Sequence, residues 1–310
     1  MERKINILIT GGAGFIGSNI ARALLKLGHE VVIVDDLYSG RLSNVPDGVK
    51  FFKMDIRDKN LEQIFKEFKI DYVSHQAARG DVRGSIDRPE EYADVNIRGG
   101  INVLECCRLN KVKGIAFASS GGCVYGEPLF TPTDESHPMQ PRDPYGATKA
   151  CFEIYLKTYR QLYGLNFTIF RYPNVYGPYQ NPFGDAGVIS ILTKAMLENR
   201  EVVINGAGDQ IRDFVFIDDI VRANIMAISL SKDHVFNVGT GFGTDINCLV
   251  ATLAEITGYK KAIKHGPAKI GEVSKSLLDS QLINSAWGWH SEVSLKDGLI
   301  ATVEFIKSDE

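Results

Sequence analysis

INILITGGAGFIG, residues 5–17, opens the chain with an apolar run that passes directly into a glycine-rich turn. The run Ile5–Thr10 is almost entirely apolar, which predicts a strand buried on both faces of a sheet. The stretch Phe15–Leu27 follows the turn and ends at Gly28, a residue that commonly terminates helices. A second apolar run, Val31–Asp35, predicts another strand. The beginning of the chain therefore predicts a strand–helix–strand unit with a glycine-rich turn after its first strand.

The same alternation of strand and helix continues as far as Arg171. Further strands are predicted at Phe51–Met54, Ile70–His75, Ile115–Ser119 and Leu165–Arg171. Helices are predicted at Leu61–Phe68, Ile97–Arg108 and Tyr145–Tyr163. Repeated β-α-β units need right-handed crossovers and produce a parallel sheet covered on both faces. The sequence therefore predicts an α/β fold built on a doubly wound, Rossmann-like parallel sheet.

The composition is that of an ordinary folded protein. Of the 310 residues 44% are hydrophobic and 24% charged, and a formal net charge of −3 argues against a nucleic-acid partner. The apolar runs fall short of the ~18 residues that a membrane span needs, and MERKINILIT, residues 1–10, leaves no room for a signal peptide. Five cysteines without a CxxC pair argue against a structural zinc or a disulfide framework. We therefore expect a cytoplasmic protein with no metal site and no membrane partner.

The glycine-rich turn lies where a dinucleotide-binding unit needs it, between the first strand and the first helix. Glycines allow the backbone to approach a pyrophosphate, and the helix N-terminus offers N–H groups to its oxygens. Asp35 ends the second strand, where a carboxylate binds both ribose hydroxyls and repels the extra phosphate of NADP. The predicted cofactor is NAD. Its predicted contacts are Gly11, Gly14, Phe15, Ile16, Gly17, Asp35 with its neighbour Asp36, and Asp55 and Ile56 beside the adenine.

YGATK, residues 145–149, opens the long predicted helix and places Tyr145 one turn before Lys149 on the same face. A tyrosine hydroxyl with a pKa of ~10 is a poor base at neutral pH. A neighbouring ammonium group and the positive nicotinamide ring favour the phenolate and bring it into a useful range. We therefore predict that Tyr145 and Lys149 are catalytic.

After Tyr172 the regular alternation is lost. Residues 173–186 contain three prolines, two glycines and two asparagines, which favour a long loop. Helices at Val188–Glu198 and Asp218–Leu230 and strands at Glu201–Ile204 and Phe214–Ile217 follow. We predict an NAD-binding domain over residues 1–172 and a smaller α/β substrate lobe over 173–310, with the chain around 235–245 returning to the first domain.

Several further segments carry a resemblance to a known family. They are HQAA (75–78), SSGGCVYG (119–126), RYPNVYGP (171–178) and RDFVFIDD (212–219). With the glycine-rich turn and YGATK, they make the chain resemble the extended short-chain dehydrogenase/reductase family from end to end, and most of all its UDP-glucose (UDP-galactose) 4-epimerases. The resemblance implies that Tyr145 takes the proton of the sugar 4-hydroxyl while hydride passes from C4 to NAD. The 4-keto sugar then turns over and receives the hydride on its other face.

The resemblance also implies roles for residues outside these motifs. Ala77, Asn96 and Tyr172 would line the NAD pocket, Lys149 would hold the nicotinamide ribose, and Arg79, Asn174, Val188, Arg212 and Lys269 would contact the UDP-sugar. The family's catalytic Ser or Thr falls on Gly121 here, so Ser120 is assigned its role on the 4-oxygen. Lys269 replaces the family's arginine, and Ser276, seven residues further, is the small residue that would admit N-acetylhexosamines (UDP-GalNAc and UDP-GlcNAc) as well.

Other functions remain open at this point. A 4,6-dehydratase needs an added acid and base where this chain has Gly122 and Cys123. A UDP-glucuronate 4-epimerase or decarboxylase remains possible because Arg79 and Arg83, in an unusual RGDVR run, could bind a carboxylate. A non-catalytic NAD-sensing regulator typically loses the tyrosine or the lysine. The resemblance further implies a homodimer through the helices at 97–110 and 145–163, whose apolar residues include Leu104, Cys107, Ile154 and Leu156.

Overall fold

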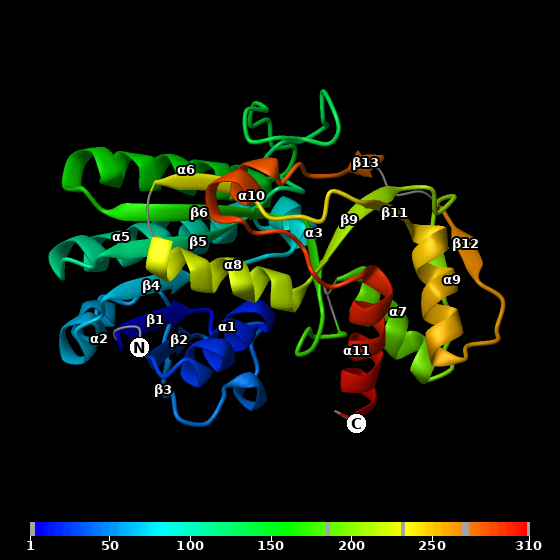
Figure 1. Cartoon of the computed structure of the whole chain (residues 1–310), viewed down its shortest axis with the longest axis horizontal. Helices are drawn as coiled ribbons and strands as arrows, with labels where there is room; N and C mark the ends of the chain where they lie inside the picture. Colours follow the sequence, from blue (N-terminus) through cyan, green and yellow to red (C-terminus); the bar gives the residue numbers. More distant parts are fainter. Residues whose placement is uncertain (1–3, 184–186, 231–232, 268–272, 309–310) are drawn as a thin grey trace.

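The computed structural model describes residues 4–183, 187–230, 233–267 and 273–308. Within these residues, seven parallel strands form the large sheet in the order β10-β6-β5-β4-β1-β2-β3 (Figure 1). They are β1 (Asn6–Thr10), β2 (Glu30–Asp35), β3 (Lys50–Lys53), β4 (Tyr72–His75), β5 (Gly114–Ser120), β6 (Asn166–Tyr172) and β10 (His234–Asn237). The predicted doubly wound, Rossmann-like sheet is confirmed.

Helices cover both faces of this sheet because each strand is apolar on both sides. Ile7 and Ile9 of β1 pack with α1 (Phe15–Lys26) and α8 (Ile217–Leu230) on one face. Leu8 lies between them in sequence and packs on the opposite face. The helices of that second face are α2 (Leu61–Phe68), α5 (Gly100–Leu109) and α6 (Pro144–Tyr163). All three β1 residues are fully buried, as expected for a central parallel strand.

A smaller lobe stands at one end of the large sheet, to the right in Figure 1. Its described strands are β7 (Asn174–Tyr176), β9 (Ile211–Phe216), β11 (Gly243–Asp245) and β13 (Lys275–Ser276) in one sheet, and β8 (Val203–Asn205) and β12 (Lys264–Gly266) in another. Helices α7 (Val188–Leu197), α9 (Ile246–Thr257) and α11 (Leu295–Ser308) pack together beside them.

The prediction of a loop throughout residues 173–186 is wrong for β7. Asn174, Val175 and Tyr176 pair in parallel with Phe214, Val215 and Phe216 of β9. The hydrogen-bond partners of this short strand come from a segment about forty residues later, which a local count of prolines and glycines does not register.

The chain passes between the large sheet and the smaller lobe more than once. Helix α8 packs against α1, β10 pairs with β6, and α10 (Gln281–Trp287) packs against β10. Elements from the second half of the sequence thus complete one edge and one face of the large sheet. In Figure 1, α8 runs beside α1 across one face of the large sheet. The next element along the chain, β10, is the edge strand beside β6.

The segment after β4 contains short elements that the sequence patterns did not predict. They are α3 (Val82–Asp87), α4 (Pro89–Ala93) and the π-helical turn η2 (Asp94–Gly99), which delays the regular start of α5 to Gly100. The Asp81 side chain accepts hydrogen bonds from the backbone N–H groups of Arg83 and Gly84 and so caps α3. This segment borders the site described below.

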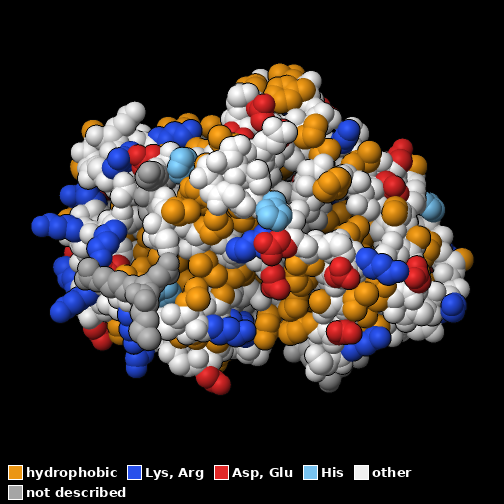
Figure 2. All heavy atoms as spheres, viewed as in Figure 1, with side chains coloured by type: hydrophobic (Ala, Val, Ile, Leu, Met, Phe, Trp, Pro, Cys, Tyr) orange, Lys and Arg blue, Asp and Glu red, His pale blue; other side chains and the backbone are white. Residues whose placement is uncertain are grey.

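The surface carries charges of both signs. Figure 2 shows Lys and Arg side chains gathered at the left edge of the face it displays, with acidic, basic and hydrophobic groups interspersed over the rest. No helix of the described residues is long and apolar enough to cross a membrane. The same part of the chain holds no cluster of His, Cys, Asp and Glu that could bind a metal, and all five cysteines are free.

Candidate active site

A cavity of about 690 Å³ lies at the carboxyl ends of the large sheet. The order of its strands reverses between β1 and β4, where ligands bind in doubly wound sheets. Most of the predicted site residues meet in this one cavity. Those that line it are Gly11, Gly14, Phe15, Ile16, Gly17, Asp35, Asp36, Asp55, Ile56, Ala77, Arg79, Ser120, Tyr145, Lys149, Tyr172 and Asn174.

The glycine-rich turn leaves a backbone-lined space, here called the glycine cradle, that larger side chains at its glycines would fill. Gly11 has φ +71°, and a Cβ there would lie 2.6 Å from the Ala77 backbone nitrogen. A Cβ on Gly17 would overlap the carbonyl oxygen of Gly11. Helix α1 begins at Phe15 with no side-chain cap from Gly14 and no acidic residue in its first turn. The cradle therefore fits an anionic pyrophosphate held by backbone N–H groups.

Asp35 is fixed at the end of β2 by the same turn. Its Oδ2 accepts a hydrogen bond of 2.9 Å from the backbone N–H of Ala13, and its Oδ1 accepts one of 2.8 Å from that of Leu37. Burial raises the pKa of Asp35, and these backbone N–H groups oppose that rise. Asp55 follows the neighbouring strand β3, and the hydrogen bonds from Arg57 lower its pKa. Two carboxylates therefore border the predicted adenosine side of the cavity.

Tyr145 and Lys149 project from the first turns of α6 into the other end of the cavity. Asp143 fixes the start of this helix by accepting a hydrogen bond of 2.7 Å from the Gly146 backbone N–H. Lys149 is buried, its Nζ donates to the Ala118 carbonyl oxygen at 2.7 Å, and burial lowers its pKa to about 7. Its Nζ lies 5.7 Å from the centre of the Tyr145 ring. The two groups predicted to act together therefore share one buried environment.

Among the protein's own groups, burial decides the acidity of Tyr145. Burial raises the pKa of its phenol well above the ordinary value, and the hydrogen-bonding interaction with Ser120 opposes this rise. The depression of this pKa expected from Lys149 does not outweigh the effect of burial. Phenolate formation thus depends on positive charge beyond what these side chains supply.

Ser119 and Ser120 face different surroundings. The Ser119 Oγ donates a hydrogen bond of 2.6 Å to Glu153 Oε1 in the buried interior. Both serines line the cavity, but it is Ser120 that interacts with the Tyr145 hydroxyl. The geometry therefore favours Ser120 over its neighbour as the hydroxyl that assists Tyr145.

Ser120→Ala is expected to lower turnover about 10²-fold, because a donor aimed at the developing charge on the 4-oxygen is lost. The KM for the sugar should stay within a few-fold, since this bond strengthens mainly in the transition state. Ser119→Ala is the matched control, with near-normal turnover and a free energy of unfolding about 1–2 kcal/mol lower because Glu153 loses a donor. Steady-state kinetics and urea unfolding measure both effects, and the reverse pattern would move the catalytic role to Ser119.

Two residues predicted to line the NAD pocket differ in their position. Asn96 does not line it, but accepts from the Arg79 backbone N–H at 2.8 Å and donates to the Arg79 carbonyl at 3.1 Å. Tyr172 does line it, and its hydroxyl accepts a hydrogen bond of 2.7 Å from Asn224 of α8. In the HQAA segment, burial lowers the pKa of His75 to about 3. Its Nδ1 is hydrogen-bonded to Thr10 Oγ1 at 2.7 Å in the buried interior, which indicates a structural role.

The predicted diphosphate and sugar contacts are only partly assembled. Arg212 of β9 and Ser276 of β13 lie opposite each other in paired strands, but neither lines the cavity. Val188 begins α7 beside Gly187, which does line it. Lys269 lies outside the described residues. The sequence analysis also missed lining residues from two loops, namely Tyr38, Tyr179, Gln180 and Asn181, because no motif marks them.

Residues 7–239 match the family described as NAD dependent epimerase/dehydratase. A putative UDP-glucose 4-epimerase of Methanocaldococcus jannaschii is 42% identical over 303 residues, which are 98% of this chain and 99% of that protein.

Two solved structures match the fold over nearly their whole length. The UDP-glucose 4-epimerase of Thermotoga maritima with UDP-glucose is 43% identical, with a TM-score of 0.97 over 98% of this chain and 99% of that one. The UDP-glucose 4-epimerase of Thermus thermophilus in complex with NAD is 39% identical, with a TM-score of 0.94 over 99% of this chain and 100% of that one. With the glycine cradle and the Tyr145–Lys149 pair in one cavity, these matches show that the chain belongs to the NAD dependent epimerase/dehydratase family.

Proposed function

We propose that the protein is an NAD-dependent UDP-hexose 4-epimerase that interconverts UDP-galactose and UDP-glucose through a transient 4-keto sugar. One observation carries the proposal: a dinucleotide cradle and the Ser120–Tyr145–Lys149 group line a single cavity. We further propose that residues 1–172 supply most of the NAD site, and that the lobe within 173–310, with Asn174, Val188, Arg212, Lys269 and Ser276, binds the sugar nucleotide.

The residues that line the cavity fit NAD. One group of them would bind the cofactor, and another group would transfer the proton. Gly11, Gly14 and Gly17 would hold its pyrophosphate and Asp35 its adenosine ribose. When bound, NAD supplies the hydride acceptor for the sugar C4 and, being positively charged, favours the Tyr145 phenolate that burial otherwise suppresses.

The side chains at the other end of the cavity handle the proton. Tyr145 takes the proton of the 4-hydroxyl and returns it to the epimeric 4-oxygen, while Ser120 donates a hydrogen bond to that oxygen. Lys149 is anchored on the Ala118 carbonyl and contributes charge beside the phenol at and below pH 7.

The alternatives lose support in the structure. Burial raises the pKa of Cys123 to about 12, so the position where a dehydratase keeps its acid and base offers no proton-transfer group. Arg79 is paired with two carboxylates, and Arg83 is exposed and does not line the cavity. The reason for expecting a uronic acid as substrate is therefore weaker. Tyr145 and Lys149 both face the cavity, unlike the sites of non-catalytic sensors.

A panel of UDP-sugars tests the proposal. Without added NAD, the purified protein should interconvert UDP-galactose and UDP-glucose, and also the two UDP-N-acetylhexosamines, as resolved by chromatography. UDP-glucuronate should remain unchanged. Conversion of UDP-glucuronate to its 4-epimer or to a pentose, without conversion of UDP-galactose, would replace the proposed function by the uronate alternative.

The N-acetyl activity depends on Ser276. Ser276→Tyr is expected to reduce turnover of UDP-N-acetylglucosamine at least about tenfold, because a ring in the space for the 2-substituent creates a clash. UDP-galactose, which has only a hydroxyl there, serves as the internal control and should change within a few-fold. An equal loss on both substrates would mean that Ser276 does not bound that space.

We also propose a homodimer in the cytoplasm. Leu104, Cys107 and Leu156, which the sequence offered for the interface, are buried in the chain's own core, while Ile154 is 57% exposed. The other exposed large apolar residues of α5 and α6 are Leu109, Leu162 and Tyr163. A light-scattering mass of two chains supports the dimer, and a mass of one chain in the active enzyme excludes it. The free state of all five cysteines fits a reducing compartment.

A further inference from the structure

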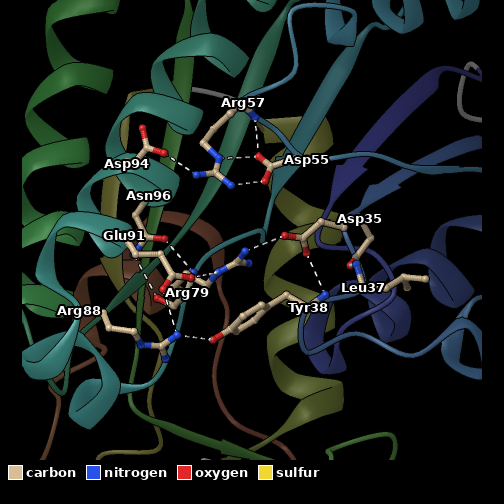
Figure 3. Close-up of polar contacts among 11 residues, drawn as sticks. Asp35, Leu37, Tyr38, Asp55, Arg57, Arg79, Arg88, Glu91, Asp94 and Asn96 are labelled. Atoms are coloured by element: carbon tan, nitrogen blue, oxygen red, sulfur yellow. Dashed lines mark hydrogen bonds and ion pairs between the residues drawn. The ribbon is translucent and has the colours of Figure 1, made fainter.

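The guanidinium of Arg79 joins two carboxylates from different elements (Figure 3). Its Nη2 lies 2.9 Å from Asp36 Oδ2, and its Nε lies 3.2 Å from Glu91 Oε1 of α4. The ring of Tyr38 packs on the guanidinium, with 3.6 Å from Cζ to the ring centre. The Arg79 side chain is only 9% exposed, so these contacts take the place of water around its charge.

A second arginine joins the same two segments. Arg88 donates to Glu91 Oε2 at 3.0 Å and to the Tyr38 hydroxyl at 3.2 Å. The Arg79 bridge, which we define as Asp36, Tyr38, Arg79, Arg88 and Glu91, therefore links the loop after β2 to the segment after β4 by several charged contacts. Asn96 fixes the Arg79 backbone from behind through its two hydrogen bonds.

The bridge stands at the adenosine end of the cavity. Strands β2 and β4 flank β1, so a link between the segments that follow them spans the end of β1 that carries the glycine cradle. Asp36, Tyr38, Arg79 and Arg88 all line the cavity together with Asp35 and Asp55. Tyr38 lines the cavity and is also 52% exposed, so it lies where this end of the cavity opens to solvent.

Engagement with two carboxylates also limits what Arg79 can bind. A guanidinium binds anions through its fork of N–H donors, and here two arms of that fork are taken by Asp36 and Glu91. The catalytic hydroxyls of Ser120 and Tyr145 come from β5 and α6, on the other side of β4 from β2. Arg79 is therefore poorly placed and poorly available for a sugar phosphate or carboxylate.

We propose that the Arg79 bridge closes the adenosine half of the cavity and sets the rate at which NAD exchanges with solvent, with Arg79 as a positioning residue for the cofactor. Opening that end of the cavity separates Asp36 and Glu91 from the guanidinium and leaves partly buried charges without their partners. An epimerase restores its NAD in every cycle, so slow exchange costs it no turnover. The inference rests on the NAD site of the proposed function and is independent of which sugar is converted.

Exchange of labelled NAD tests the bridge directly. Protein loaded with ¹⁴C-labelled NAD is mixed with a large excess of unlabelled NAD and desalted at intervals, and the retained label gives the dissociation rate. Arg79→Gln should speed dissociation about tenfold or more, the change expected when charge-assisted hydrogen bonds are lost. Glu91→Gln should act in the same direction, although Glu91 does not line the cavity. The double variant should dissociate no faster than Arg79→Gln, because both changes break one bridge.

Arg98→Gln is the matched control. Arg98 pairs with Asp94 on the neighbouring turn at 2.6 Å, and its side chain is 71% exposed, so its loss should leave NAD exchange unchanged. Glu91 is partly exposed, so Glu91→Gln is expected to fold. It provides the same test of the bridge if Arg79→Gln does not fold.

Three outcomes would overturn the proposal. One is dissociation of NAD from both bridge variants at the wild-type rate, and another is equal acceleration by Arg98→Gln. The third is a raised KM for the UDP-sugar in Arg79→Gln that added NAD does not correct, which would make Arg79 a substrate ligand. Absence of epimerase activity in the wild type would contradict the proposed function alone, because the exchange of label needs no sugar.

Discussion

Tyr145→Phe is expected to lower the rate of epimerisation about 10²–10⁴-fold, the usual cost of losing a general base. The phenol is the group in the cavity that can exchange a proton with the sugar 4-hydroxyl while Ser120 supports the oxygen. Phenylalanine preserves the ring that packs near Lys149, so NAD retention should persist. Initial rates with UDP-galactose and the NAD content after denaturation measure the two properties separately.

Tyr163→Phe provides the matched control on the same helix. Its hydroxyl lies at the C-terminal end of α6, on a residue that is 52% exposed, and its removal should leave the rate unchanged. Near-normal epimerisation by Tyr145→Phe would exclude the proposed proton transfer. Loss of NAD together with activity would instead mean that the hydroxyl supports the cofactor.

Glu153→Gln is expected to lower the free energy of unfolding by about 3–5 kcal/mol, because it leaves a buried arginine without its counter-charge. Glu153 is fully buried and pairs with Arg171 through Oε2–Nη2 at 2.6 Å and Oε1–Nε at 3.0 Å. It also accepts from Ser119, beside the cavity, and stands one turn after Lys149 on α6. Urea unfolding at a fixed NAD concentration measures the change.

A surface ion pair provides the comparison. Glu62 of α2 pairs with Lys66 at 2.7 Å in an exposed i, i+4 arrangement, and Glu62→Gln should cost less than about 1 kcal/mol. Equal losses in the two variants would show that the buried Glu153–Arg171 pair is no more important to stability than a surface pair.

The sequence predicted those parts of the fold that depend on local pattern. The apolar runs around Ile7 and Val32 are buried on both sides and identify central parallel strands regardless of distant contacts. The glycine-rich turn and YGATK also lie at the ends of a strand and a helix, so their position along the chain predicts which edge of the sheet they face. Most of the residues that we propose to bind NAD therefore lie together in the cavity, as their positions in the sequence predicted.

The rest depended on contacts between distant segments. The sequence did not predict an ion pair for Arg79, because its partners Asp36 and Glu91 are 43 and 12 residues away. No pattern of short-range spacing connects residues so far apart. The raised pKa of Tyr145 follows from burial, which spacing to Lys149 does not reveal. From the sequence, Leu104 and Leu156 were equally consistent with a dimer interface and with the interior of the chain. Only the packing in the structure shows that they are buried in the interior.

The repeated passage of the chain between the large sheet and the smaller lobe makes the two halves of this enzyme inseparable. A fragment that ended at Tyr172 would lack β10 and leave β6 as an unpaired apolar edge, open to intermolecular association. It would also lack Asn224, which holds the Tyr172 hydroxyl from α8. The half that we propose to bind the sugar therefore cannot be exchanged as an independent unit while the half that we propose to bind NAD stays unchanged. New sugar specificity in this architecture has to arise by substitutions within one jointly folding unit.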